Sequence, residues 1–153
     1  MFQHILLPID GSATASAAVE KTIGIAKAFG STVTPIYVID PYPFTGAGAD
    51  FGYGQEQYLN AARADADAAI AAAKERFDAV GIAAQPRVVE AHAVWRGILD
   101  TAHDVGADLI VMGSHGRRGL EKLVLGSVAQ SVLAHADINT LVVRMASQGS
   151  GNS

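Results

Sequence analysis

One stretch of the chain combines glycines and a serine at spacings that suit the binding of phosphate. Gly113 and Gly116 are separated by two residues, and after nine more come Gly126 and Ser127. Gly113 and Gly116 can take φ > 0 and can let the backbone come close to a ligand. Gly126 and Ser127 would open a helix, whose first N–H groups lack partners and attract anions. An anion therefore suits this stretch better than an apolar ligand does.

Several basic residues allow two interpretations each. Arg117 and Arg118 would either clamp phosphate oxygens or only keep the loop soluble, and we expect one of the two to contact the ligand. His115 would either reach a phosphate or simply be solvated. Lys122 lacks the Gly-Lys-Ser/Thr context of a P-loop and is not expected to act as a Walker lysine. His4 lies in the first apolar stretch and is expected to face solvent or to pair at the strand edge rather than to bind a ligand.

A strand and a helix must hold this loop in place. The run from Leu109 to Met112 is short, apolar and β-branched in its middle, which is typical of a strand buried on both faces. After the loop, Val128, Val132 and Leu133 indicate the apolar side of a helix. Residues 109–133 therefore predict a strand, a phosphate-binding loop and a helix.

The start of the chain predicts the same kind of unit. Residues 2–9 and 32–39 are apolar enough for two strands. Between them Ser12 or Thr14 can cap a helix, which Gly30 ends. A right-handed crossover would make the two strands parallel.

The middle of the chain interrupts this alternation once. Prolines and glycines recur over residues 40–54, which predicts a long loop whose aromatic side chains cover a site or pack on a partner, with partial order on binding or assembly. From Gln55 to Val80, alanine and larger apolar residues recur every three or four positions, which predicts a helix. Gly81 would end it.

Two strands and one helix complete the expected fold. Residues 85–90 predict a third, shorter strand, and Pro86 near its start favours an edge position. Residues 92–105 predict a helix with Trp95 facing the core, and residues 137–144 contain a final strand. Alternating strands and helices indicate a doubly wound parallel sheet.

Ligands of such sheets bind beyond the carboxyl ends of the strands, at the point where the winding reverses. If the first and fourth strands are neighbours there, Asp10 and Gly113 lie side by side across one crevice. Asp10 could then hold Mg²⁺ through water, or bond only to the ribose or base of a nucleotide.

The spacing of Gly113, Gly116, Gly126 and Ser127 resembles that of the universal stress protein family, in the branch that binds ATP through this motif. The resemblance covers residues 5–144. It implies a three-layer α/β fold of the adenine nucleotide alpha-hydrolase-like type, with a five-stranded parallel sheet of strand order 3-2-1-4-5. It also implies that the loop holds the phosphates and ribose of ATP or another adenine nucleotide.

The resemblance assigns further residues to the expected site. Asp10 and the backbone near Val38 would line the adenosine, and Pro8, Ile9 and Met112 would form apolar walls. The expected nucleotide-binding residues are Pro8, Ile9, Asp10, Val38, Met112, Gly113, His115, Gly116, Arg117, Arg118, Gly126, Ser127 and Val128.

A second copy of the chain is the other expected partner. Residues 140–143, Thr-Leu-Val-Val, form an apolar strand at the expected end of the sheet, and an uncovered edge invites pairing. In the resembled family this strand pairs antiparallel with its two-fold mate. The chain is therefore expected to form a homodimer, with higher oligomers left open.

Composition limits the other partners and the compartment. The 153 residues suit one domain, which we expect over residues 1–146 with a disordered tail at 147–153. A formal net charge of −4 without a basic run argues against a nucleic-acid polymer as partner. No apolar run approaches the ~20 residues of a membrane span, and the start does not resemble a signal peptide. We expect a cytoplasmic protein.

Three functions remain open from the sequence. The favoured one is a stress-response regulator whose bound ATP or related nucleotide sets its conformation or its partners. The others are an enzyme that turns over a nucleotide and a dimeric interaction module whose pocket is empty or differently filled. Because no general base accompanies the phosphate-binding groups, we expect slow ATP hydrolysis or none.

Overall fold

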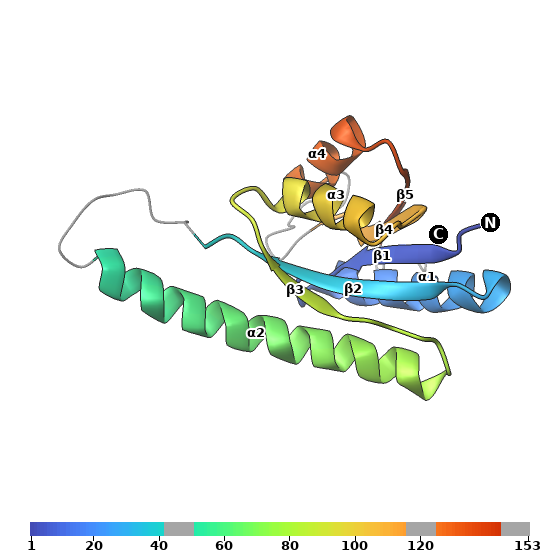
Figure 1. Ribbon diagram of the computed structural model, residues 1–153, viewed down its shortest axis with the longest axis horizontal. Coiled ribbons are helices and arrows are strands. Elements are labelled where there is room, and N and C mark those ends of the chain that lie inside the picture. Colours follow the sequence, from blue (N-terminus) through green and yellow to red (C-terminus); the bar gives the residue numbers. More distant parts are fainter. Residues whose placement is uncertain (42–50, 116–124, 145–153) are drawn as a thin grey trace, which may run out of the picture.

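A five-stranded parallel sheet forms the middle of the protein in the computed structural model, which describes residues 1–41, 51–115 and 125–144 (Figure 1). Its strand order is β3-β2-β1-β4-β5, and all four neighbouring pairs are parallel. The strands are β1 (His4–Pro8), β2 (Thr32–Ile39), β3 (Arg87–Glu90), β4 (Leu109–Gly113) and β5 (Asn139–Val143). The expected fold class and the strand order 3-2-1-4-5 are confirmed.

Helices cover both faces of this sheet and make it the middle of three layers. The helices are α1 (Ala13–Phe29), α2 (Phe51–Ala79), α3 (Val94–Asp104) and α4 (Ser127–His135). One apolar core lies between the sheet and helices α1 and α2, and a second lies between the sheet and helices α3 and α4. Figure 1 shows α2 and α3 on opposite sides of β2.

The central strand β1 shows why the sheet needs both layers. Ile5, Leu6 and Leu7 are all fully buried, with Ile5 and Leu7 in the first core and Leu6 in the second. Successive side chains of a strand point to opposite faces. Three consecutive apolar residues therefore bury completely only when both faces are covered.

Helix α1 begins and ends where its capping residues predict. The Ser12 hydroxyl accepts a hydrogen bond from the Ala15 N–H at 3.2 Å, so Ser12 is the N-cap. Gly30 ends the helix in the left-handed conformation with φ of 68°. Of the two residues proposed as caps, Ser12 has this role, and Thr14 is free for another contact.

Helix α2 corrects the predicted loop over residues 40–54. The helix has 29 residues and begins at Phe51, so that Gly52 and Gly54 lie inside it. It is about 43 Å long at 1.5 Å per residue, and its N-terminal part extends beyond the strands (Figure 1). A glycine in a helix costs only about 1 kcal/mol, which a long packed helix tolerates. The rest of that segment, residues 42–50, lies outside the described residues, and so does the expected tail at 147–153.

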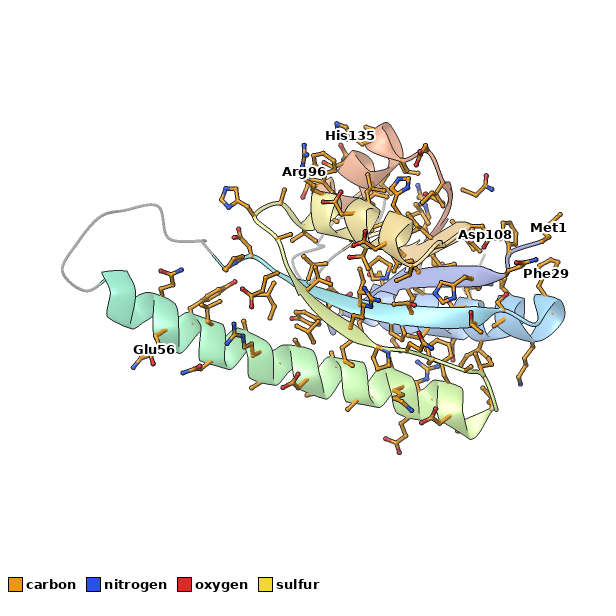
Figure 2. All side chains as sticks on the ribbon, in the orientation of Figure 1. Met1, Phe29, Glu56, Arg96, Asp108 and His135 are labelled. Carbon is orange, nitrogen blue, oxygen red and sulfur yellow. The ribbon has the colours of Figure 1, made fainter. Side chains whose placement is uncertain are left out.

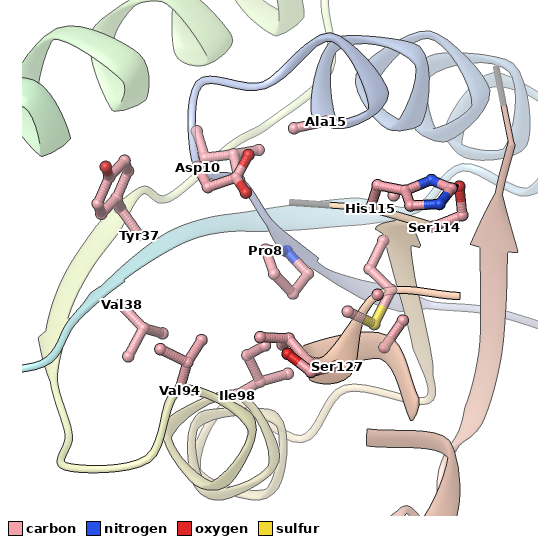
Figure 3. A pocket seen from close by; sticks show the side chains of 16 residues that line it. Pro8, Asp10, Ala15, Tyr37, Val38, Val94, Ile98, Ser114, His115 and Ser127 are labelled. Atoms are coloured by element: carbon pink, nitrogen blue, oxygen red, sulfur yellow. The ribbon is translucent and has the colours of Figure 1, made fainter. Parts of the chain in front are cut away.

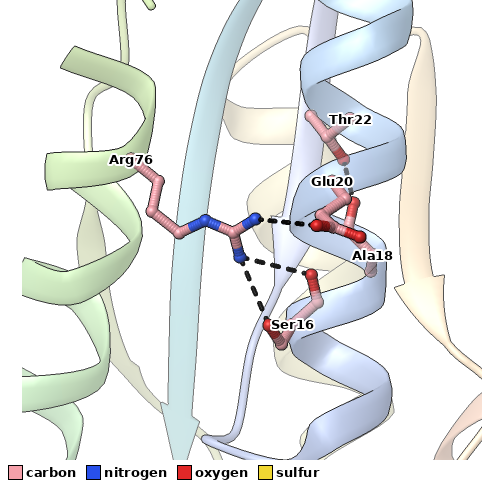
Figure 4. A network of polar contacts seen from close by, with 5 residues as sticks. All are labelled: Ser16, Ala18, Glu20, Thr22 and Arg76. Atoms are coloured by element: carbon pink, nitrogen blue, oxygen red, sulfur yellow. Dashed lines mark hydrogen bonds and ion pairs between the residues drawn. The ribbon is translucent and has the colours of Figure 1, made fainter. Parts of the chain in front are cut away.

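Polar contacts hold α2 against α1. The Arg76 guanidinium donates hydrogen bonds to the Ser16 carbonyl and hydroxyl at 3.4 and 3.3 Å, and it lies 3.7 Å from the Glu20 carboxylate (Figure 4). All three side chains are partly open to solvent, so these contacts fix the register of the two helices more than they add stability. In the same view the buried Thr22 hydroxyl donates to the Ala18 carbonyl of its own helix at 2.8 Å.

Several element boundaries differ slightly from the prediction. The first and third strands begin at His4 and Arg87, two residues later than expected, and α3 begins at Val94 instead of residue 92. Ala93, the N-cap of α3, has no side chain that can cap the helix. Boundaries without a capping signal are the least predictable from sequence.

Trp95, the chain's single tryptophan, joins α3 to α4 rather than filling the core completely. Its ring is half-buried and stacks on the His135 ring with centroids 4.2 Å apart, and the Arg96 guanidinium carbon lies 5.0 Å from its centroid. Figure 2 shows Arg96 and His135 together on the outer side of this layer. Within the described part of the chain, no helix is long and apolar enough to cross a membrane.

His4 pairs with a neighbouring strand, as one of its two predicted alternatives required. Its Nδ1 lies against the Thr32 hydroxyl, and its Nε2 lies 2.6 Å from the Thr34 hydroxyl. Burial lowers the pKa of His4 below the ordinary 6.5, although the nearby Asp108 carboxylate acts in the opposite direction. The folded protein therefore favours the neutral imidazole.

We predict that His4 makes the protein less stable in mild acid. Since the pKa of His4 is lower in the folded state, the unfolded chain binds more protons than the folded protein does once the pH falls below 6.5. The free energy of unfolding should decrease from that pH down to the folded-state pKa of His4. The His4→Gln variant should show a smaller decrease in urea unfolding measured over the same pH range. An identical pH profile for both proteins would contradict this role.

Candidate functional site

A cavity of about 450 Å³ opens at the carboxyl ends of β1 and β4. The chain leaves β1 toward α1 on one face of the sheet, and after β4 it forms α4 on the other face. The winding therefore reverses between these two neighbouring strands, as the sequence predicts for a ligand site. Asp10 and Gly113 both line this cavity, so the expected crevice exists.

The cavity brings together every expected site residue that the structure describes. These residues are Pro8, Ile9, Asp10, Val38, Met112, Gly113, His115, Gly126, Ser127 and Val128. The other three expected residues, Gly116, Arg117 and Arg118, lie outside the described residues. Residues from four separate segments of the chain thus line one cavity.

Asp10 is held in a fixed place at the turn between β1 and α1. Its Oδ1 accepts a hydrogen bond from the Ser12 N–H at 2.9 Å. Gly11 permits this tight turn, because its φ of 80° is strained for any residue with a side chain. In Figure 3 the Asp10 carboxylate lies beside the cavity, across from Pro8. The second carboxylate oxygen can therefore accept a bond from a ligand.

The absence of a side chain at Gly113 makes room for α1. Positive φ among the described glycines occurs at other positions, so Gly113 does not use the φ > 0 that glycine permits. A Cβ at Gly113 would instead lie 2.7 Å from the Thr14 hydroxyl oxygen and 2.9 Å from the Thr14 backbone carbon. Gly113 is therefore needed because α1 packs directly against the end of β4.

His115 lines the cavity with one ring nitrogen bonded and the other unpaired. Its Nδ1 lies 3.0 Å from the Ser114 hydroxyl, whereas its Nε2 is buried and has no hydrogen-bond partner among the described residues. The alternative that His115 is simply solvated is therefore wrong. A buried nitrogen without a partner is costly.

The first turn of α4 offers backbone N–H groups to the same cavity. Gly126 is the N-cap, with φ of −62° and ψ of 155°, and it provides no side-chain cap for the N–H groups that follow. Its own N–H donates to the Ser114 carbonyl at 2.7 Å, which ties the start of α4 to the end of β4. The exposed Ser127 hydroxyl lies at the cavity beside these N–H groups. An anion at this position would satisfy them.

Apolar side chains that the sequence analysis did not assign to the site form much of the remaining wall. Val94 and Ile98 lie one turn apart on α3, and Tyr37 extends from β2 (Figure 3). Helix α3 can approach β2 this closely because Gly97 has no side chain. A Cβ at Gly97 would lie only 3.0 Å from the Val38 side chain. Residues four apart on a helix share one face, but only the packing shows that the face of Val94 and Ile98 borders the cavity.

Asp10 is the one carboxylate that lines the described part of the cavity. No three His, Asp or Glu side chains of the described residues lie close enough together to hold a metal ion. A metal at Asp10 would therefore take most of its ligands from water and from phosphate oxygens, which is a pattern that suits Mg²⁺.

Known proteins resemble this chain in sequence over nearly its whole length. The family model described as "Universal stress protein family" matches residues 1–144. Universal stress protein MJ0531 of Methanocaldococcus jannaschii is 33% identical over 144 residues, which is 94% of this chain and 83% of that protein. This chain belongs to the universal stress protein family.

Solved structures agree with this assignment. The protein MJ0577, the subject of a structure-based assignment of biochemical function, superposes on this family member with a TM-score of 0.82 and 27% identity, over 97% of this chain and 99% of the other. Two structures with lower sequence identity share the fold, each with a TM-score of 0.65. One is a universal stress protein in complex with cAMP, which is 24% identical over 94% of this chain and 97% of the other. The second is a universal stress protein from Archaeoglobus fulgidus in complex with dAMP, which is 18% identical over 94% of this chain and 98% of the other.

We predict opposite effects from adding a methyl group at two glycines. Gly113→Ala should lower the free energy of unfolding by about 1–3 kcal/mol, because the new Cβ meets Thr14 backbone. Gly24→Ala, at an exposed position of α1 where an added Cβ would meet nothing within 4 Å beyond its own helix backbone, should raise it by about 0.5–1 kcal/mol. Chemical denaturation of both variants tests this. A Gly113→Ala variant as stable as Gly24→Ala would show that α1 does not pack tightly on β4.

Proposed function

We propose that this universal stress protein binds ATP or a related adenine nucleotide in the cavity between β1 and β4. The observation that supports this most is that one cavity is lined both by apolar side chains and by the uncapped start of α4. A nucleotide combines an apolar base with an anionic phosphate group, and it matches both kinds of lining at once.

The residues that line the cavity fall into groups according to the part of the nucleotide that they would bind. Val38 and Met112 would pack against the base, and Asp10 would accept hydrogen bonds from the ribose or base. Gly126 and Ser127 would bind the phosphates through backbone N–H groups and the hydroxyl. Gly116, Arg117 and Arg118, outside the described residues, remain predicted phosphate contacts from the sequence, and Mg²⁺ would bind between the phosphates and Asp10.

The relatives support an adenine nucleotide as the ligand class. Two universal stress proteins of the same fold were solved with cAMP and with dAMP, and both ligands contain an adenine base and one phosphate. A regulator would use such a ligand to change its conformation or its choice of partner. We propose that this chain acts as a regulator of that kind, as a single domain over residues 1–146 and in the cytoplasm.

A slow nucleotide hydrolase is the second candidate. His115 lines the cavity, and an imidazole can act as a general base. The described cavity offers no second carboxylate to assist it. Multiple turnovers near the ~10 per second typical of enzymes would favour the hydrolase, whereas nucleotide that copurifies intact favours the regulator.

The test is calorimetric titration of nucleotide-free protein with ATP. Gly126→Val should abolish or strongly weaken binding while the fold survives, because the φ of −62° suits any residue but the added side chain would occupy the phosphate position. Ser127→Ala should cost roughly 0.5–1.5 kcal/mol of binding free energy. Ser131→Ala, one turn further along α4 and away from the cavity, is the matched control and should bind as the unmodified protein does.

Circular dichroism must show that all four proteins are folded. Equal ATP affinity of the unmodified protein and Gly126→Val would mean that the start of α4 does not bind phosphate. Failure of the unmodified protein to bind ATP at millimolar concentration would contradict the proposed function itself.

We also propose a homodimer through the open edge of β5. Leu141 is 39% exposed on this strand, which is the end of the described sheet. The Val143 carbonyl accepts from the Ser114 N–H at 2.8 Å, so the backbone groups of Val143 face β4. Because alternate residues of a strand face opposite sides, those of Val142 face the open edge and are available to a second copy.

Val142→Pro should therefore convert the dimer to a monomer, since proline removes the N–H that faces outward and leaves the bonds to β4 in place. Sedimentation velocity at micromolar concentration measures this directly. A monomeric unmodified protein at that concentration, or a dimer that survives the substitution, would exclude this interface.

A further inference from the structure

The apolar part of the cavity lies between the sheet and α3. Val38 of β2 and Met112 of β4 line it from the sheet. Val94 and Ile98 line it from α3. All four side chains also belong to the second core, so the cavity continues the packed interface between these two layers. The distance between the sheet and α3 therefore sets how wide the cavity is between these walls.

Gly97 is the point at which α3 meets the sheet beside this cavity. The residue is buried, and a Cβ on it would lie 2.8 Å from the Ala91 Cβ and 3.0 Å from the Val38 Cγ1. Carbon atoms in ordinary contact are about 3.5–4.0 Å apart. With a side chain at position 97, α3 would have to lie roughly 1 Å further from the sheet at this point.

The sheet side of this contact is fixed, so α3 is the part that would move. The Ala91 N–H donates to the Ile39 carbonyl at 2.9 Å, which holds Ala91 at the end of β2. The Ala91 Cβ is attached directly to this backbone and cannot turn away, whereas the Val38 side chain can change its rotamer. The contact between Gly97 and Ala91 is therefore the one that does not yield.

A shift of α3 at Gly97 would reach the cavity directly. Val94, Gly97 and Ile98 stand at positions i, i+3 and i+4 of one helix, so they share one face. Figure 3 shows Val38 beside Val94, with Ile98 in the same wall of the cavity. A gap of only about 0.5–1 Å removes a quarter to a half of the dispersion attraction across a contact. A small displacement of this wall would thus weaken its hold on a bound ring.

We propose that Gly97 is a positioning residue that fixes the width of the cavity where the base of the nucleotide binds. Because it has no side chain, the wall formed by α3 lies close enough to the sheet to hold a planar ring between them. This inference rests on the proposed binding of an adenine nucleotide. It adds a residue that does not line the cavity, yet selects nucleotides over sugar phosphates without a base.

Gly97→Ala tests the proposal with AMP and ribose 5-phosphate, two probes that differ by the base. The variant should bind AMP about three- to tenfold more weakly, because the ring loses close contact with one wall, and it should bind ribose 5-phosphate as before. One added methyl group should leave the domain folded, which circular dichroism checks. Titration calorimetry of nucleotide-free protein gives both affinities.

Two exchanges between glycine and alanine elsewhere are the matched controls. Gly24→Ala adds the same methyl group at a position of α1 where a Cβ would meet nothing within 4 Å beyond its own helix backbone. Ala102→Gly destabilises α3 itself, at a fully buried position that does not line the cavity. Both should bind AMP as the unmodified protein does. An equal loss of AMP affinity in Ala102→Gly and Gly97→Ala would reveal a general weakening of α3 and overturn the proposal.

A second change at Ala91 separates the contact from other effects of the alanine. Gly97→Ala combined with Ala91→Gly removes the carbon that lies 2.8 Å away and should recover most of the lost AMP affinity. Ala91→Gly alone should bind AMP normally. Ala91→Val presses on the same contact from the sheet side, and it replaces Gly97→Ala if that variant does not fold. No recovery in the double variant would mean that this contact does not set the width of the cavity.

The outcomes separate this inference from the function on which it rests. If the unmodified protein binds AMP and Gly97→Ala binds it equally well, only the role of Gly97 is wrong. The same holds if the variant loses affinity for both probes by one factor, or if the unmodified protein binds both equally. If ribose 5-phosphate binds too weakly to measure, the controls and the double variant decide alone. If the unmodified protein binds neither ATP nor AMP, the proposed function and this inference both fail.

Discussion

Burial of the central strands on both faces is the constraint on which the rest of this structure depends. Ile5, Leu6 and Leu7 of β1 are fully buried, and so are Ile110 and Val111 of β4. Strands buried in this way leave no face for polar side chains, so polar groups gather where the strands end. β1 and β4 end side by side at the point where the winding reverses, and the cavity lies there.

The close approach of α1 to β4 connects this packing to the site. Gly113 has no side chain because Thr14 fills the space, and Thr14 in turn bonds to the backbone of His115. The contact that holds α1 on β4 therefore also reaches the backbone of a residue that lines the cavity.

Helix α2 shows how long-range packing overrides local composition. The glycines at 52 and 54 indicated a loop, yet the helix that contains them begins at Phe51. Further along, Ala66, Ile70 and Phe77 are buried against the sheet. Once those contacts hold a helix, each added residue costs little, because extending an existing helix is far easier than starting one.

The sequence, with the family resemblance that it carries, predicted the order of the strands, the glycine that ends α1, and ten of the sixteen described residues that line the cavity. Those features depend on local periodicity, on capping chemistry, and on a glycine and serine spacing that resembles a known family. Only the tertiary structure decided why Gly113 is a glycine, where the nitrogens of His115 lie, and that Val94 and Ile98 form a cavity wall. Each of these depends on contacts between residues far apart in the chain, and local patterns contain no information about such distances.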